Sequence, residues 1–163
     1  MTKLGVNTSD QKRRQFLNRL SGEITKRGII DVLRNGVKAY PADLIMFYFT
    51  PTENNEKSKQ MFEKNIFSVT RQLRYSIDAS KLALDLCLFI NGLPVITIEL
   101  KNHFTGQATA DAVEQYKDDR SPHDLLFSFK RCMVHFAVDD QTVMFCTKLA
   151  GKDSWFLPFN KGY

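Results

Sequence analysis

Three charged residues interrupt a stretch, residues 82–101, whose alternating apolar residues otherwise indicate a buried β-hairpin. Because side chains alternate across a strand, Asp85, Glu99 and Lys101 fall on one face, and leucines and isoleucines occupy the other. Two close carboxylates repel each other unless a cation lies between them, and oxygen ligands of this kind suit Mg²⁺. A neighbouring lysine can hold the attacking water or stabilise charge on a phosphate. These residues therefore suit metal-assisted phosphodiester hydrolysis.

The turn of the hairpin predicts how its strands pair. Asn91-Gly92 supplies the positive φ angles of a tight turn, and a three-residue loop ending at Leu93 pairs Ile90 with Pro94. This register places Asp85 opposite Glu99. Spacing alone is equally compatible with a surface ion pair between Glu99 and Lys101 and a solvated carboxylate at Asp85.

The hairpin must be held by a larger sheet and its helices. Helical spacing from Ser9 onward, behind an Asn, Thr, Ser or Asp cap, predicts a first helix, and the polar residues 52–59 open another. Ala108, Ala112 and Gln115 share a helical face small enough to lie against a sheet. The predicted strands are residues 42–49, 66–75, 132–138 and 142–147, and short helices are expected at 29–33 and 108–117. This order predicts a mixed α/β fold.

Length and composition place the chain among ordinary globular proteins. Its 163 residues fit one domain, with a mostly helical part at 1–65, a catalytic core sheet and helix at 66–150, and a carboxy-terminal segment at 151–163. No apolar run approaches the roughly 18 residues that span a bilayer, so no membrane partner is expected. The start shows no hydrophobic signal segment and the 3 cysteines form no C-x-x-C pair, which predicts a cytoplasmic location.

The basic balance points to an acidic partner without identifying it. The net charge is +5 and the isoelectric point is about 9.1, values that suit nucleic-acid binding and plain solubility equally well. We expect about half of the candidate DNA-contacting residues to touch phosphates. These candidates are Arg71, Arg74, Lys117, Arg120, Lys130 and Arg131. The histidines lack metal-binding spacing, and His135 is expected to be a satisfied core residue.

Several separated blocks resemble one family. LDLCLFINGLPVITIELKN, DAVEQYKDDRSP, RCMVHFAVDD, FLPFNKG and the upstream RQLRYS resemble the amino-terminal nuclease region of the R subunit of type I restriction enzymes, within the PD-(D/E)xK superfamily. The resemblance runs from about Phe16 to Tyr163 and implies a restriction-endonuclease-like fold, a central mixed sheet flanked by helices. It implies Asp85 and Glu99 as Mg²⁺ ligands and Lys101 as the catalytic lysine.

The resemblance carries further implications. Gln115 matches the glutamine of the family's Q-x-x-x-Y motif, whereas Asp119 stands in place of its tyrosine. The expected activity is that of a type I site-specific deoxyribonuclease on double-stranded DNA. The expected partners are the motor region and the methyltransferase and specificity subunits of the complex. ATP is expected only for the motor part, because residues 146–153 lack the first glycine and the Ser/Thr of a Walker loop.

Two alternatives stay open beside cleavage. The chain starts late compared with the family, which leaves open whether it lacks an acidic residue that an early helix sometimes contributes, with Glu23 a possible substitute. A fragment without that ligand would act as a non-cleaving module that binds DNA or docks onto other subunits. The third hypothesis is another nuclease of the superfamily, of the repair or junction type.

Overall fold

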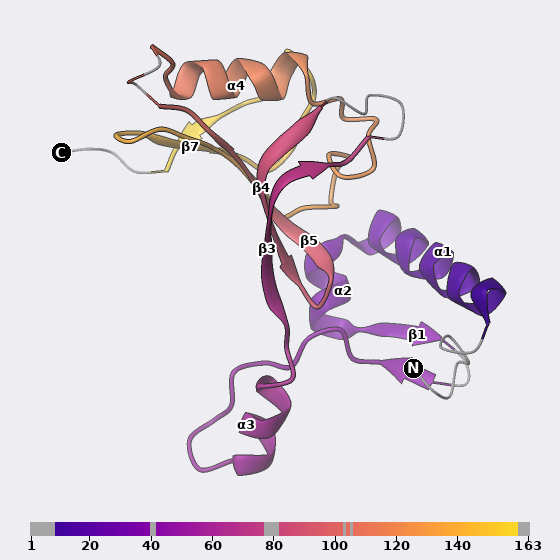
Figure 1. Cartoon of the computed structure of the whole chain (residues 1–163). Helices are drawn as coiled ribbons and strands as arrows, with labels where there is room; N and C mark the ends of the chain where they lie inside the picture. The colour runs from indigo at the N-terminus through magenta and orange to yellow at the C-terminus, as the bar shows by residue number, and fades with distance from the viewer. Residues whose placement is uncertain (1–8, 40–41, 77–81, 103, 105, 160–163) are drawn as a thin grey trace. The chain divides into compact units, whose positions relative to one another are not determined.

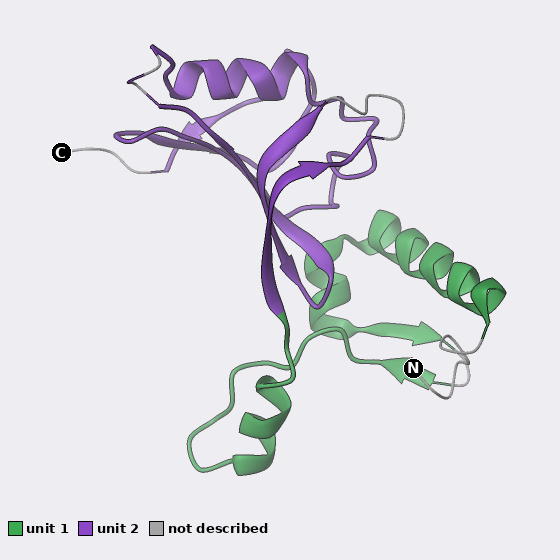
Figure 2. Cartoon of the chain, viewed as in Figure 1, with its two compact units in different colours: residues 1–66 green, residues 67–163 purple. Residues whose placement is uncertain are grey.

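The computed structural model describes residues 9–39, 42–76, 82–102, 104 and 106–159. It divides the chain into two compact units, residues 1–66 and 67–163 (Figure 2). The sequence predicted a single domain whose mostly helical part ends at residue 65, one residue before the last residue of the first unit. The second unit contains every residue predicted for catalysis.

The described residues of the first unit form three helices and two short paired strands. Its elements are α1 (Asp10–Arg27), α2 (Ile29–Asn35), β1 (Val37–Ala39), β2 (Ala42–Leu44) and α3 (Glu56–Phe62). The Ser9 side chain accepts a hydrogen bond from the Lys12 amide, which confirms the predicted cap of α1. The strand predicted over 42–49 was too long, because only β2 pairs, with β1. Among the described residues, no helix has both the length and the apolarity to cross a bilayer.

In the second unit, the described residues form a six-stranded sheet and one α-helix. Its elements are β3 (Phe67–Arg74), β4 (Ala83–Ile90), β5 (Leu93–Leu100), α4 (Thr109–Asp118), β6 (Val134–Val138), β7 (Val143–Cys146) and β8 (Leu157–Pro158). The strands lie in chain order from β3 to β8, and only β5 and β6 pair in parallel. Parallel neighbours need a crossover, and the segment containing α4 provides it (Figure 1). The structure thus confirms the predicted α/β class with a mixed sheet.

Helix α4 lies on one face of this sheet and determines which side chains become core. Thr109, Ala112 and Tyr116 are its buried residues: Ala112 was predicted, and Thr109 and Tyr116 each follow a predicted residue, Ala108 or Gln115, by one position. Ala112 and Tyr116 join a core that also contains Leu84, Cys87, Phe127, Ala137, Cys146 and Leu149. The small Ala112 side chain lets the helix approach the strands closely.

The face of β5 under α4 is the one that carries the charge. Val95, Thr97 and Glu99 are buried, whereas Ile96 and Ile98 on the opposite face are only half-buried. The more apolar face of this strand is therefore the more exposed one. Glu99 consequently lies inside the protein, and its carboxylate must be neutralised there.

The hairpin turn differs from its prediction although the register beyond it agrees. Ile90 pairs with Leu93 and not with Pro94, so the loop is the two residues Asn91 and Gly92. A register shift follows at Leu88 and Phe89, after which Leu86 pairs with Ile98. The shift acts as a β-bulge that compensates for the shorter loop. The last pair of this register, Leu86 with Ile98, is the one that the predicted register requires, and it precedes Asp85 and Glu99 by one step.

Candidate active site

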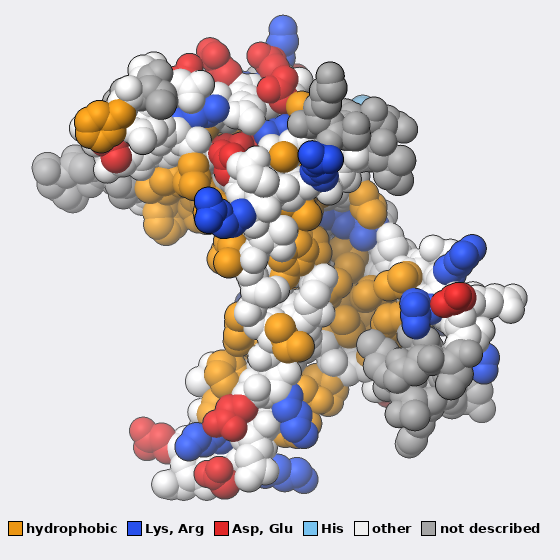
Figure 3. Space-filling model, viewed as in Figure 1, with side chains coloured by type: hydrophobic (Ala, Val, Ile, Leu, Met, Phe, Trp, Pro, Cys, Tyr) orange, Lys and Arg blue, Asp and Glu red, His pale blue; other side chains and the backbone are white. Residues whose placement is uncertain are grey.

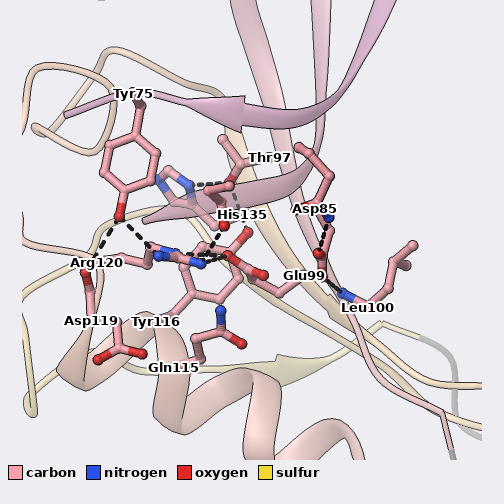
Figure 4. Close-up of polar contacts among 12 residues, drawn as sticks. Tyr75, Asp85, Thr97, Glu99, Leu100, Gln115, Tyr116, Asp119, Arg120 and His135 are labelled. Atoms are coloured by element: carbon pink, nitrogen blue, oxygen red, sulfur yellow. Dashed lines mark hydrogen bonds and ion pairs between the residues drawn. The ribbon is translucent and has the colours of Figure 1, made fainter. Parts of the chain in front are cut away.

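Glu99 is the most enclosed charged residue of the site. Its side chain is 0% exposed. Its Oε1 atom accepts a hydrogen bond from Nε of Arg120 at 2.7 Å and forms an ion pair with Nη2 of the same residue, also at 2.7 Å (Figure 4). No donor in the described part of the chain reaches Oε2, which is also buried. Oε1 thus contacts two guanidinium nitrogens, whereas Oε2 has no hydrogen-bond partner among the described residues.

Arg120 follows α4 and is held from three sides. Besides Glu99, its Nη1 donates to the Tyr75 hydroxyl at 2.9 Å and its Nη2 donates to the carbonyl of Ala83 at 2.9 Å. The side chain is 1% exposed. The prediction that Arg120 contacts DNA is therefore wrong, because a side chain enclosed and bonded in this way cannot reach a phosphate. A basic residue in a polar segment looks exposed in sequence, and its acidic partner lies 21 positions away.

Asp85 is held at both carboxylate oxygens. Oδ1 accepts from the Gln72 side-chain amide and Oδ2 from the backbone amide of Leu100, each at 2.8 Å. Gln72 has a φ of 50°, in the left-handed region that costs a non-glycine residue energy. Its neighbours Arg71 and Leu73 pair with residues of β4, but Gln72 does not. The sequence analysis did not single out Gln72, although it lies in the RQLRYS block.

Lys101 and Gln115 are in direct contact. The Lys101 ammonium donates to the Gln115 side-chain carbonyl at 2.7 Å, and the Lys101 backbone amide donates to Val138 at 2.8 Å. The first bond joins the end of β5 to α4 on the face where Glu99 lies. Lys101 is half-buried, which leaves part of its side chain in contact with solvent.

The electrostatics of the site depend on burial and on three charges. Burial raises the pKa of Glu99 to about 7, the Arg120 guanidinium opposes this rise, and the Asp85 carboxylate adds to it. Burial alone would lower the pKa of Arg120, but Glu99 raises it. The effect of Asp85 on the Glu99 pKa indicates that the two carboxylates are close enough to interact.

A buried polar network lies beside these residues. The Thr97 hydroxyl is 2.9 Å from the Tyr116 hydroxyl and 2.7 Å from Nδ1 of His135. Burial lowers the pKa of His135 to about 4, so the ring is neutral at physiological pH. This environment agrees with the predicted core role of His135. Thr97 and Tyr116, which complete the network, were not recognised from the sequence, because β-branched and aromatic residues there indicate only packing.

The donor set fits a divalent ion, although it is small. Among the described residues, no cluster of three or more His, Cys, Asp or Glu side chains could hold a metal. Two carboxylates are nonetheless sufficient for Mg²⁺, which keeps several waters and takes phosphate oxygens as further ligands. The buried, unpartnered Oε2 of Glu99 beside a second carboxylate is the feature that such an ion would satisfy.

The other predicted basic residues have different surroundings. Arg71, Arg74 and Lys130 are exposed, and Lys130 lies 5.8 Å from the centre of the Phe129 ring. Lys117 and Arg131 are half-buried, and burial lowers the pKa of Arg131. On the face drawn in Figure 3, Lys and Arg side chains are dispersed among acidic and apolar ones. Arg71, Arg74 and Lys130 are exposed enough to reach DNA, but exposure does not test the contact, so their role in DNA binding stays a prediction.

The upstream acidic substitute is engaged elsewhere. Glu23 lies in α1, in the first unit, where its carboxylate forms an ion pair with Arg27 at 2.8 Å. This i,i+4 pair is a common way to stabilise a helix surface. The site formed around Asp85 and Glu99 consists entirely of residues of the second unit.

Comparison with known proteins agrees with the arrangement. No curated protein and no solved structure matches the chain. A family model does match, over residues 8–154, and this range includes Asp85, Glu99, Lys101, Gln115 and Arg120. The mixed sheet with its flanking helix is consistent with the restriction-endonuclease-like fold implied by the sequence. The chain belongs to the family described as the type I restriction enzyme R protein N terminus.

Proposed function

We propose that this chain is a Mg²⁺-dependent DNA endonuclease domain, which hydrolyses phosphodiester bonds of double-stranded DNA within a type I restriction complex. The observation that supports this most directly is the buried Glu99 carboxylate, whose Oε2 has no donor among the described residues and which interacts with Asp85. A structural ion pair would need only Glu99 and Arg120. A second carboxylate and a lysine on the same face add what hydrolysis requires.

The carboxylates of Asp85 and Glu99 would hold the ion. When bound, Mg²⁺ supplies Lewis-acid stabilisation of the phosphate and of the leaving 3′ oxygen. Asp85 is fixed by Gln72 and the Leu100 amide, and Glu99 by Arg120, so both carboxylates are oriented before DNA arrives. Such preorganisation lowers the cost of assembling the site during the reaction.

Lys101 would act on the attacking water and on the phosphate. Gln115 accepts one of its three ammonium protons and fixes the position of the nitrogen. The remaining N–H groups can orient a water toward phosphorus and stabilise the negative charge that develops there. Water adds to phosphorus and loses a proton to solvent, the bond from phosphorus to the 3′ oxygen breaks, and the 3′ oxygen takes up a proton from solvent and leaves as a hydroxyl.

A plasmid-nicking assay at low salt with Mg²⁺ tests this proposal. We expect Glu99→Gln and Lys101→Ala to reduce nicking by on the order of 100-fold or more. The matched controls are Glu114→Gln, on the exposed side of α4, and Lys59→Ala, on exposed α3, and both should nick like the unmodified chain. Equal Mg²⁺-dependent nicking by all five proteins would refute the proposal.

A non-cleaving module is the second candidate, and one observation favours it. Arg120 already neutralises Glu99, and a two-carboxylate site has the smallest ligand set for this chemistry. This module would bind duplex DNA or dock onto the motor and methyltransferase partners without cutting. In the nicking assay it predicts no Mg²⁺-dependent nicking by the unmodified chain, together with retained duplex binding. A marked preference for branched over plain duplex DNA would instead indicate a repair or junction nuclease.

The proposed setting follows from the family. The R subunit works within a restriction-modification complex, so the proposed location is the cytoplasm, where incoming DNA is met. ATP would be used by the motor region and not by the residues described here, which contain no Walker loop sequence. DNA sequence recognition is assigned to another subunit of the complex.

A further inference from the structure

We infer that Arg120 is the positioning residue of the proposed metal site. It binds Oε1 of Glu99, so that Oε2 remains available as a metal ligand. This inference rests on the proposed function, because it assigns Arg120 a role toward the ion that Asp85 and Glu99 would hold. It also explains why a buried arginine stands where the sequence predicted a DNA contact.

The first support is the way the ion pair is made. A guanidinium usually pairs with a carboxylate through two parallel bonds, one to each oxygen. Arg120 instead directs both Nε and Nη2 to Oε1 of Glu99, each at 2.7 Å. Oε2 is left buried without a donor in the described part of the chain. The pair therefore separates the carboxylate into a structural oxygen and a free one.

The second support is that the guanidinium is itself immobilised. Nη1 donates to the Tyr75 hydroxyl and Nη2 to the Ala83 carbonyl, both at 2.9 Å. Tyr75 follows β3, and Ala83 lies in β4 two residues before Asp85. Arg120 thus fixes Glu99 relative to the strand that carries the second carboxylate. Figure 4 shows the guanidinium between Tyr75 and Glu99.

The third support is the cost of this arrangement. Burying an ion pair requires desolvation of both charges, and an apolar pair of similar volume is often as stable or more stable. The Arg120 side chain is only 1% exposed, and stability alone gives little reason for a guanidinium at so buried a position. An ordered carboxylate that must present one oxygen to a ligand does give a reason. Substituting residues that orient metal ligands in this way commonly weakens metal affinity by about ten- to a hundredfold.

Direct titration of the full chain with Mn²⁺, following free Mn²⁺ by electron paramagnetic resonance, tests the inference without measuring cleavage. Arg120→Lys keeps the positive charge but cannot place two N–H groups on Oε1 while bonding Tyr75 and Ala83. We expect it to weaken Mn²⁺ binding about 10- to 100-fold. Unchanged affinity in Arg120→Lys would overturn the inference, because charge alone would then suffice.

A second pair of variants covers the case in which Arg120→Lys does not fold. Tyr75→Phe removes one bond to Arg120 and leaves both charges in place, and we expect it to weaken Mn²⁺ binding by less than Arg120→Lys. Tyr116→Phe is the matched control, because it removes a buried hydroxyl that contacts Thr97 and not Arg120. Equal affinities of these two variants and the unmodified chain would also overturn the inference.

The same titration distinguishes this inference from the proposed function. If Asp85→Asn and Glu99→Gln leave Mn²⁺ binding unchanged, the metal site itself is refuted, together with the role of Arg120. If both weaken binding while Arg120→Lys and Tyr75→Phe do not, the site stands and only the positioning role is refuted. Tighter binding in Arg120→Lys would likewise refute it, because Arg120 would then compete with the ion.

Discussion

Arg120 and Glu99 meet through a single carboxylate oxygen, with two N–H groups at 2.7 Å from Oε1 and no donor in the described chain at Oε2. This relationship joins the segment after α4 to the carboxyl end of β5. It converts a residue that would otherwise be an unpaired buried charge into a fixed, half-satisfied carboxylate. The contribution of this contact to protein stability and its contribution to metal binding can therefore be tested separately.

Breaking the pair should destabilise the protein in a pH-dependent way. Removing one partner of a buried pair costs about 3–5 kcal/mol, so Arg120→Met should unfold at lower urea concentration. Without Arg120, the pKa of Glu99 rises further above its ordinary 4.5, and the folded state binds a proton that the unfolded state has lost. The penalty should therefore be larger at pH 8 than at pH 5.

The double variant Arg120→Met, Glu99→Gln provides the control for that experiment. It has no ionisable group at either position, so its stability relative to the unmodified chain should vary less between these pH values than that of Arg120→Met. An equal reduction in stability for Arg120→Met at pH 5 and pH 8 would contradict the interpretation of Glu99 as the group responsible.

His135 should contribute stability that disappears in acid. Its folded pKa is lowered from 6.5 to about 4, so the unfolded state binds the proton more readily between these values. The contribution is complete above pH 6.5 and is lost as the pH falls toward 4, and the shift corresponds to roughly 3 kcal/mol. The difference in unfolding free energy between the unmodified chain and His135→Asn, measured by urea titration from pH 7.5 to 4, should shrink by about this amount. A constant difference would show that His135 does not titrate this way.

Gln72 combines backbone strain with a contact to Asp85, and two substitutions separate these effects. Its φ of 50° suits glycine better than alanine, so Gln72→Gly should be more stable than Gln72→Ala by about 1 kcal/mol. Both substitutions remove the bond to Asp85 Oδ1, so both should weaken Mn²⁺ binding by a similar factor. Thermal unfolding and the metal titration measure the two effects. Equal stabilities would show that the conformation of Gln72 carries no strain.

Gly36 should be intolerant of a side chain. Its φ is +66°, and a Cβ atom there would collide with the carbonyl oxygen of Leu44. Gly36→Ala should cost about 2 kcal/mol or more, measured by urea unfolding. Gly22→Ala is the control, because nothing lies within 4 Å of its added Cβ and the residue is helical. That change should stabilise by about 0.5–1 kcal/mol. The same destabilisation at both positions would refute the argument from local geometry.

Duplex binding should depend on the exposed arginines of β3. Arg71→Ala and Arg74→Ala together should weaken binding uniformly across sequences and lower the salt slope by about 1 for each phosphate that is no longer neutralised. The control is Lys57→Ala with Lys59→Ala, two exposed lysines of α3 that were not predicted to contact DNA. Fluorescence anisotropy at several salt concentrations measures both. Equal slopes for the two double variants would remove β3 from the DNA interface.

Features that depend on neighbours in the chain could be derived from the amino-acid pattern. The Ser9 cap, the alternation of β4 and β5 and the Asn91-Gly92 turn were all predictable, because capping, pleating and positive φ are local properties. The separated blocks also indicated the family. Asp85, Glu99 and Lys101 on one face followed from parity alone, whereas their catalytic role remains a prediction.

Which face of the hairpin is buried, and which residue neutralises the buried charge, became clear from the three-dimensional packing. The buried face is the one that α4 covers. The residue pattern of β5 does not indicate this face, because the more apolar face of the strand is the more exposed one. The Arg120 to Glu99 contact spans 21 positions, and that from Gln72 to Asp85 spans 13. Such pairs form because a buried charge must find a partner wherever the fold brings one within reach, and sequence spacing carries no record of that distance.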